Sequence, residues 1–365
     1  MSVEGISVME NTKTLRIGLG TFDALKGALM VSVIIGHALP HYTMDGFLIT
    51  CLTVLAGFFA SGAMPAFYMI AGMQFKEKPS VQFAKKSASD FMKPYALTGL
   101  AVAIFFPIVY YIRTRWLPAV IRETPHWILS YVLGISTAQT YVFGYQIYEC
   151  YVAWFLPTMF IGLNLLNLII KNESKIVRHF LVIASVLIGF VLVKAGLVYF
   201  YIGQGMVALG FCYMGYLGKQ QGFFQRYKLP VWVWVGLVLA FVLQSGRSHF
   251  SIAYINNTGN ILNYFAAAAS AALILLLAIR VANTKWDPPE WLVKIGSHCP
   301  WVICIHAVEL SVFPWYRLPE LLPYSNDVVF LIEMLLKVIV ILPCCVIIKK
   351  IVKYKLMKKL ERNSR

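Results

Sequence analysis

Charged residues are scarce in this sequence, and acidic residues are the scarcest. Only 16 of the 365 residues are Asp or Glu, and all charged residues together make up 13% of the chain, against roughly 25% in soluble domains. Hydrophobic residues make up 59%, which is more apolar surface than one soluble core can bury. The composition therefore excludes a soluble globular protein and predicts a protein whose solvent is the lipid bilayer.

The fingerprints of common soluble enzyme classes are also missing. The sequence contains no C-x-x-C pair, no H-E-x-x-H, no G-x-S-x-G, no Walker motif and no dinucleotide fingerprint of the G-x-G-x-x-G form. Its seven cysteines lie mostly within apolar segments, and we expect them to be reduced, buried, small hydrophobic residues. The sequence therefore predicts neither a bound metal nor a bound cofactor.

Apolar stretches recur along nearly the whole chain. A hydrocarbon core about 30 Å thick needs roughly 20 apolar residues per helix. Asp23 and Lys26 lie inside the first stretch, and no A-x-A cleavage pattern follows it, so we expect a retained helix instead of a signal peptide. Residues 127–150, rich in Tyr, Gly, Ser and Thr, are predicted to form a lid or re-entrant segment. The fold class is an all-α polytopic membrane protein of about ten transmembrane helices, at 22–39, 47–74, 91–112, 151–170, 178–194, 197–217, 230–245, 261–281, 296–313 and 328–351.

Lysine and arginine set the predicted orientation, because these residues are retained on the cytoplasmic side during insertion. With ten spans, most of the 32 basic residues fall on one side. Both ends are therefore predicted to be cytoplasmic, 1–20 as a polar N-terminal segment and 349–365 as a basic tail near anionic lipid headgroups. This distribution accounts for the net charge of +16 without a nucleic-acid partner. Residues 1–365 are predicted to form a single membrane domain.

Ionisable residues within the first predicted helix are candidate functional residues, because each costs at least about 2.5 kcal/mol at membrane depth. Lys26 and His37 are almost a whole number of helical turns apart, so they share one stripe roughly 16 Å long, and Asp23 lies on it as well. We expect this stripe to line a polar cavity that runs from Asp23 and Lys26 at the cytoplasmic end to His37 in the outer half. The alternative is an interfacial Asp23–Lys26 pair and a histidine used only in helix packing.

Two further pairs of ionisable residues lie in late apolar stretches. His306 and Glu309 are three residues apart on one helical face, at a depth comparable with that of His37. Glu333 and Lys337 are four residues apart and are predicted to form a structural ion pair. The H-x-x-E spacing lacks a third ligand, so it does not predict a metal site.

Several short motifs follow one another along nearly the full chain. They are M-P-A-F-Y-M-I-A-G from Met64, K-P-Y from Lys93, W-F-L from Trp154 and I-G-S-H-C-P-W-V-I-C-I-H from Ile295. Together with Lys26 and His37, which are separated by ten residues, these motifs make the sequence resemble acyltransferase family 3, whose first helix shows a basic residue, ten residues and a histidine. Ala71, in the motif that begins at Met64, stands where the family usually has serine, and no R-x-x-R follows that motif.

The resemblance implies an O-acyltransferase of a bacterial inner membrane. Such an enzyme moves an acyl group, usually acetyl, from cytoplasmic acyl-CoA to a hydroxyl of a cell-envelope glycan or its lipid-linked precursor. The reaction needs a base for the hydroxyl proton, and a neutral histidine suits this role. His37 is our candidate base, with His306, Glu309 or Glu149 as its partners. Asp23 is about 21 Å away along the helix axis and is too distant to contact His37.

Phosphate groups of acyl-CoA need positive charges on the cytoplasmic side. We expect Lys26 with its neighbour Asp23, and Lys85, Lys86 and Lys93, to bind acyl-CoA, although the orientation rule alone also predicts lysines there. Two alternatives to the enzyme stay open. One is a proton-coupled secondary transporter, for which related halves would be expected and none is evident. The other is a non-catalytic component of surface-polymer assembly, which could also use the Tyr, Trp and Arg residues of 113–150 to contact sugars.

Overall fold

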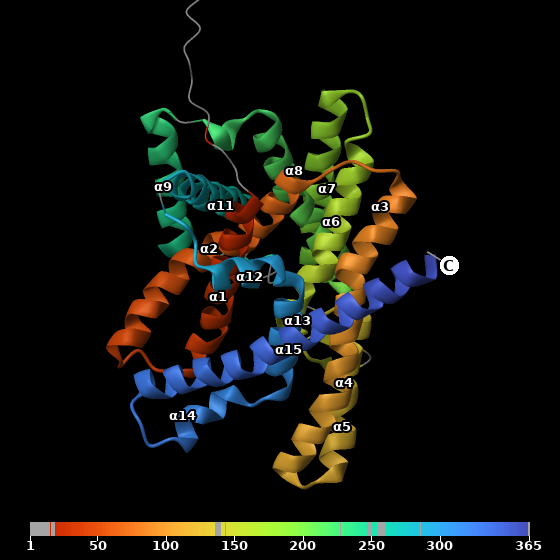
Figure 1. Ribbon diagram of the computed structural model, residues 1–365, viewed down its shortest axis with the longest axis vertical. Helices are drawn as coiled ribbons and strands as arrows, with labels where there is room; N and C mark the ends of the chain where they lie inside the picture. Colours follow the sequence, from red (N-terminus) through yellow and green to blue (C-terminus); the bar gives the residue numbers. More distant parts are fainter. Residues whose placement is uncertain are drawn as a thin grey trace, which may run out of the picture.

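The computed structural model describes Leu15 and residues 19–135, 140–142, 144–226, 228–246, 250–253, 260–284 and 286–363, and these are helical almost throughout (Figure 1). One short hairpin pairs two strands in antiparallel register, with Thr140 opposite Ile147. The elements are α1 (Leu19–Ala38), η1 (Leu39–His41), α2 (Phe47–Gln74), α3 (Ser80–Ser87), η2 (Ala88–Met92), α4 (Lys93–Thr114), α5 (Leu117–Leu133), β1 (Thr140–Val142), β2 (Tyr145–Ile147), η3 (Tyr151–Trp154), α6 (Phe155–Ile169), α7 (Lys175–Lys194), η4 (Tyr199–Tyr201), α8 (Ile202–Gln220), η5 (Phe223–Gln225), α9 (Val231–Gly246), α11 (Ile261–Ala282), α12 (Glu290–Ser297), α13 (Cys299–Val312), η6 (Trp315–Arg317), α14 (Leu318–Leu321) and α15 (Asn326–Asn363).

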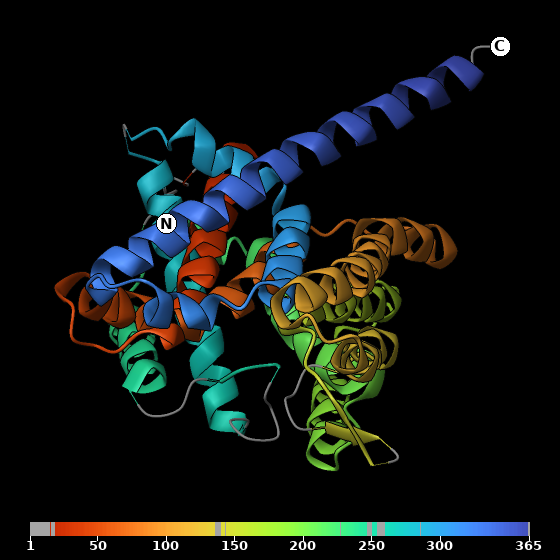
Figure 2. The same ribbon diagram turned by 90° about the horizontal axis from the view of Figure 1, so that it is seen from below.

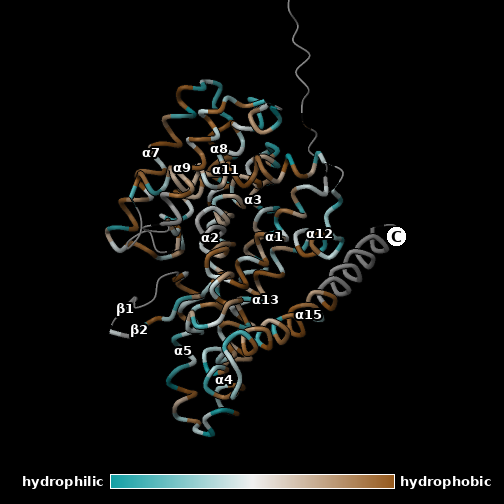
Figure 3. Tube along the Cα trace, turned by 90° about the vertical axis from the view of Figure 1, so that its left-hand side faces the viewer, coloured by the Kyte–Doolittle hydropathy of each residue, from teal (hydrophilic) through white to brown (hydrophobic). Residues whose placement is uncertain are grey.

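The described helices include six that are long and apolar enough to cross a membrane, or up to eight if two bent helix pairs each count as one span. Figure 3 shows apolar residues along these helices and more hydrophilic residues towards opposite ends of the molecule. The predicted all-α membrane class is therefore confirmed. Two of the ten predicted stretches correspond to α8 and α9, which are not among the candidate spans. The count of ten spans and the cytoplasmic location of both ends stay predictions.

The interior position of α8 explains why its sequence is less apolar than that of its neighbours. This helix packs against α2, α6 and α7, and it carries the fully buried amide of Gln204. A helix surrounded by protein can carry polar residues that a lipid-facing helix could not. Small residues bring the helices close, because a Cβ atom on Gly72 or Gly215 would collide with the backbone of the partner helix.

The predicted lid region, 127–150, divides into two different structures. Its first part belongs to α5, a helix that begins at Leu117, ten residues before the predicted segment, with Pro118 in its first turn. Proline is favoured at that position because its missing N–H would have no partner there. The second part contains β1 and β2. Figure 1 shows α4 and α5 side by side at the lower end of the molecule, where they extend beyond the other helices.

A sharp bend between α12 and α13 places the late helices against α1. The two helices meet at 80°, and Pro300 stands in the first turn of α13. Before the bend, α12 packs closely on α1, with Gly296 next to the backbone of Asp23. After it, α13 contacts the later part of α1. The last helix, α15, packs across α13 and also contacts α1. Figure 2 shows that it continues beyond the rest of the molecule.

Candidate active site

A cavity of about 400 Å³ lies at the end of α1, between α4, α5 and the segment that follows α13. This volume is within the usual range for small-molecule sites. Two histidines, several tyrosines and tryptophans, and two charged residues contribute to its wall. The lining residues are His37, His41, Phe106, Val109, Tyr110, Arg113, Glu123, Trp127, Tyr148, Tyr151, Leu310, Ser311, Val312, Phe313, Pro314, Trp315 and Tyr316.

The two cavity histidines are one helical turn apart in the sequence. His37 lies in the last turn of α1, and His41 ends the short helix η1 that continues it. Residues four apart on a helix lie on the same face. This local geometry explains why both imidazoles line one cavity.

His306 lies directly behind His37. The two ring centroids are 5.5 Å apart and the rings meet edge to face. His306 is fully buried, and its Nδ1 lies 2.5 Å from Oε1 of Glu309. This contact assigns the proton to Nδ1, so the Nδ1–H donates to the carboxylate. The Nε2 atom of His306 is buried without a hydrogen-bond partner among the described residues.

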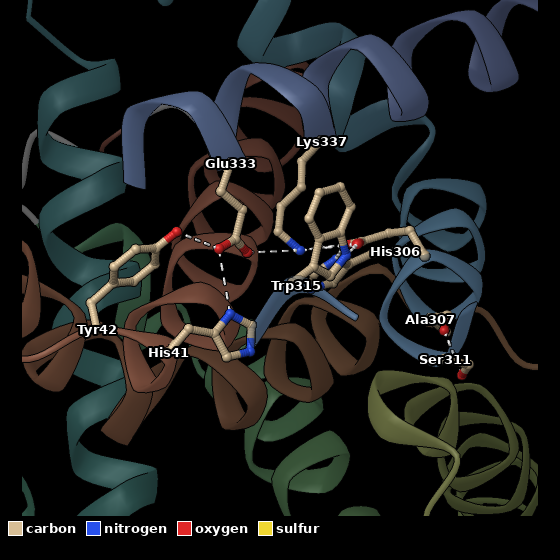
Figure 4. Close-up of polar contacts among 9 residues, drawn as sticks. His41, Tyr42, His306, Ala307, Ser311, Trp315, Glu333 and Lys337 are labelled. Atoms are coloured by element: carbon tan, nitrogen blue, oxygen red, sulfur yellow. Dashed lines mark hydrogen bonds and ion pairs between the residues drawn. The ribbon is translucent and has the colours of Figure 1, made fainter. Parts of the chain in front are cut away.

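Lys337 of α15 connects Glu309 to a second glutamate. Its Nζ donates to both carboxylate oxygens of Glu309, at 2.8 and 2.9 Å, and lies 3.4 Å from Oε1 of Glu333. Trp315 supports the same group, because its indole N–H donates to Glu309 and its ring centroid is 4.6 Å from the Lys337 ammonium. These buried charges are thus paired and hydrogen-bonded, as charges away from water must be (Figure 4).

The other carboxylate oxygen of Glu333 faces His41, a residue that lines the cavity. This Oε2 atom accepts a hydrogen bond of 2.7 Å from the Tyr42 hydroxyl and lies 3.4 Å from Nδ1 of His41. The contacts therefore form a chain, which we call the buried charge chain and define as His306, Glu309, Lys337, Glu333 and His41. One end, His306, lies beside His37, and the other end, His41, lines the cavity itself.

Aromatic side chains form the opposite wall of the cavity. Trp127 stacks on Tyr151 with ring centroids 5.8 Å apart and also contacts Tyr148. The Tyr148 hydroxyl donates to Glu123, and Arg122 pairs with the same carboxylate at 2.9 Å. Burial raises the pKa of Glu123, but these two partners outweigh it and hold the pKa below its usual value.

The structure brings together three of the four residues proposed for catalysis, namely His37, His306 and Glu309. Glu149 follows β2 and lies between the cavity-lining Tyr148 and Tyr151 in the chain, but it is not itself part of the lining. The residues that meet at the cavity come from α1 and α13, which the sequence could relate only by their expected depth.

The prediction of one continuous polar cavity along α1 is wrong. Asp23 and Lys26 form an ion pair of 2.7 Å with side chains 29% and 22% exposed, and neither lines the cavity that contains His37. Close packing explains the difference, because the α12 backbone lies against α1 at Gly27, between the two sets of residues. The two ends of the predicted stripe therefore have separate surroundings.

The lysines proposed to bind acyl-CoA lie on the surface. Lys85 and Lys86 are exposed on α3, and Lys93 is exposed at the start of α4. Lys86 pairs with Asp90 at 2.6 Å. No hydrogen bond or ion pair in the described part of the chain joins these lysines to Lys26.

Sequence reasoning missed the role of α15 in this site. Glu333 and Lys337 do pair, as predicted, but Lys337 lies closer to Glu309 and so connects the pair to His306. His41 and Trp315 were also missed. The spacing of His41, four residues after His37, was an available signal, whereas nothing in the sequence relates Trp315 to Glu309.

Comparisons with known proteins complete these observations. A family model described as an acyltransferase domain matches residues 19–350. No curated protein and no solved structure matches the chain. Among the described residues, no group of three or more His, Cys, Asp or Glu side chains could hold a metal ion.

Proposed function

Because this chain belongs to acyltransferase family 3, we propose that it is an O-acyltransferase that uses cytoplasmic acyl-CoA, with acetyl as the expected acyl group. The acceptor is a hydroxyl of a cell-surface polysaccharide or its lipid-linked precursor, and the location is a bacterial cytoplasmic membrane. One observation carries the proposal: His37, at the family's spacing from Lys26, lines a cavity and has the His306–Glu309 pair behind it.

His37 is the group placed to accept the proton of the acceptor hydroxyl. The hydroxyl oxygen attacks the thioester carbonyl carbon, a C–O bond forms, and the C–S bond breaks with its electron pair leaving on sulfur. His37 takes the proton as the oxygen attacks, which is general base catalysis. Glu309 fixes the orientation of His306, whose ring lies edge to face against the ring of His37.

The aromatic wall supports a glycan acceptor. Trp127, Tyr148 and Tyr151 present ring faces and hydroxyl groups around one cavity. Aromatic side chains combine an apolar face with a polar edge, and sugar rings offer the complementary combination of C–H faces and hydroxyl groups. Arg113 and Glu123 add hydrogen-bonding groups at the same wall.

We assign acyl-CoA binding to Lys26, near the other end of α1, and to three lysines of α3 and α4. Lys26 lies at the Asp23 end, away from the cavity, and Lys85, Lys86 and Lys93 are exposed on α3 and α4. Ammonium groups of this kind bind phosphates as point charges.

The test is a transfer assay with the purified protein in lipid nanodiscs, radiolabelled acetyl-CoA and a cell-envelope extract. We expect labelled glycan, and we expect His37→Ala to lower the rate by about 100-fold or more, which is typical for loss of a general base. His179→Ala is the matched control, because His179 is exposed on α7 and lies outside the cavity. Substrate uptake or efflux without acyl transfer would favour the transporter instead, and full activity of the His37 variant would contradict the assigned base.

A further inference from the structure

His41 is the second histidine of the cavity, and it is held in a specific orientation. Its side chain is 19% exposed, whereas Glu333 is fully buried beside it. Nδ1 lies 3.4 Å from the Glu333 carboxylate, and Figure 4 shows the other ring nitrogen pointing away from that carboxylate. A histidine whose Nδ1 faces a carboxylate keeps Nε2 for proton exchange with a bound molecule.

The buried charge chain carries one more negative charge than positive charge. It contains two carboxylates, Glu309 and Glu333, and only one ammonium, Lys337, placed between them. Each carboxylate also faces one histidine, His306 or His41. His41 is the partly exposed member of this chain and lines the cavity, so it is the member placed to exchange a proton with a bound molecule.

The positions of the two cavity histidines suit the two sides of an acyl transfer reaction. The attacking oxygen and the leaving sulfur are bonded to the same carbonyl carbon, so a base and an acid must act from two neighbouring positions. His37 and His41 are four residues apart, about 6 Å along a helix axis. Both line the same cavity, and of the two only His41 has a ring nitrogen that faces a carboxylate, that of Glu333.

We propose that His41, positioned by Glu333, is the proton donor to the leaving thiolate. This inference rests on the proposed acyl transfer. His41 gives a proton to the sulfur as the C–S bond breaks, so the product is a neutral thiol. His37 at the same time holds the proton of the acceptor hydroxyl. Return of that proton to His41 through cavity water restores the starting state, and no proton is gained or lost over the cycle.

The proposal predicts a dependence on the leaving group that a structural role would not produce. Some acyl donors contain a thiol that is much more acidic than that of coenzyme A, for example a 4-nitrophenyl thioester of acetate. The thiolate of such a donor leaves without needing a proton. For His41→Ala we expect a rate loss of about 100-fold with acetyl-CoA and a clearly smaller loss with the activated thioester. Glu333→Gln should show the same donor-dependent pattern with a smaller loss.

Two comparisons decide the outcome. His41→Gln repeats the test in a variant that keeps more of the side-chain volume, and His37→Ala should lose activity with both donors because its role does not depend on the leaving group. Equal losses with the two donors in both His41 variants, or no loss, would overturn the proposal while the acyl transfer itself stands. Full activity of His37→Ala would instead contradict the assigned base.

Discussion

The two ends of α1 carry similar residues in different surroundings. At the first end, Asp23 and Lys26 pair with each other and stay partly exposed. At the second end, His37 lines a cavity and meets a chain of buried charges that comes from α13 and α15. The difference teaches that helical spacing places ionisable residues on one stripe, whereas the neighbouring helices decide which part of the stripe becomes a site.

The packing of α12 and α13 produces this difference. The α12 backbone lies against Gly27, where there is no room even for a methyl group. The 80° bend before Cys299 then changes the direction of the chain, and α13 brings His306 to His37 while the cavity forms beside it. Along α1, the tightly packed part at Gly27 is thus followed by the part at His37 that lines a cavity.

The largest effect on stability should come from removing the positive charge of Lys337, which Glu309 and Glu333 share near the His37 end of α1. Lys337→Met leaves Glu309 and Glu333 buried without their ammonium, and breaking a buried pair costs about 3–5 kcal/mol. We expect a large fall in the midpoint of thermal unfolding of the detergent-purified protein, together with loss of acyl transfer. The double variant Lys337→Met with Glu333→Gln should recover part of the stability. An unchanged midpoint in the single variant would show that the chain contributes little to the fold.

The next effect tests the tight packing between the two ends. Gly27→Ala places a Cβ atom against the Leu292 carbonyl, and such overpacking costs about 1–3 kcal/mol. Gly36→Ala is the matched control on the same helix, because a Cβ atom there meets nothing within 4 Å. We expect the unfolding midpoint to fall only for the Gly27 variant. Equal midpoints for the two variants would contradict the close α1–α12 contact.

A pH-dependent effect should appear in the cavity wall. Since the folded-state pKa of Glu123 is lowered, its carboxylate contributes stability that is present above the unfolded-state pKa of about 4.5. This contribution is lost as the pH falls through the folded-state value. Glu123→Gln should therefore reduce the difference in unfolding midpoint between pH 7 and pH 4. The same pH difference in wild type and variant would rule out this role.

The smallest effect on stability should come from the first end. Asp23 and Lys26 form a partly exposed pair, and such pairs contribute about 0–1 kcal/mol. Lys26→Ala should hardly change the unfolding midpoint but should raise the KM for acyl-CoA several-fold, since the variant loses a charge proposed to bind phosphate. Lys194→Ala is the control, because Lys194 is also exposed and lies on α7, outside the proposed site. An unchanged KM in the Lys26 variant would remove it from the donor site.

The sequence by itself determined the class of this protein and most of its helices. Scarce charge and repeated apolar stretches require a membrane environment, and the spacing of Lys26 and His37, with the later motifs, identified the family that the comparison then confirmed. These features are local, because composition and helical periodicity depend only on neighbouring residues.

Only the tertiary structure decided which ionisable residues meet. His306 reaches His37 because α13 turns sharply at Pro300, and Lys337 reaches Glu309 because α15 crosses α13. A sequence gives the spacing of residues within one helix, but contacts between helices depend on bends and on small residues that set how closely backbones approach. The candidate active-site cavity is therefore a property of helix packing, whereas its first histidine could be found from the sequence.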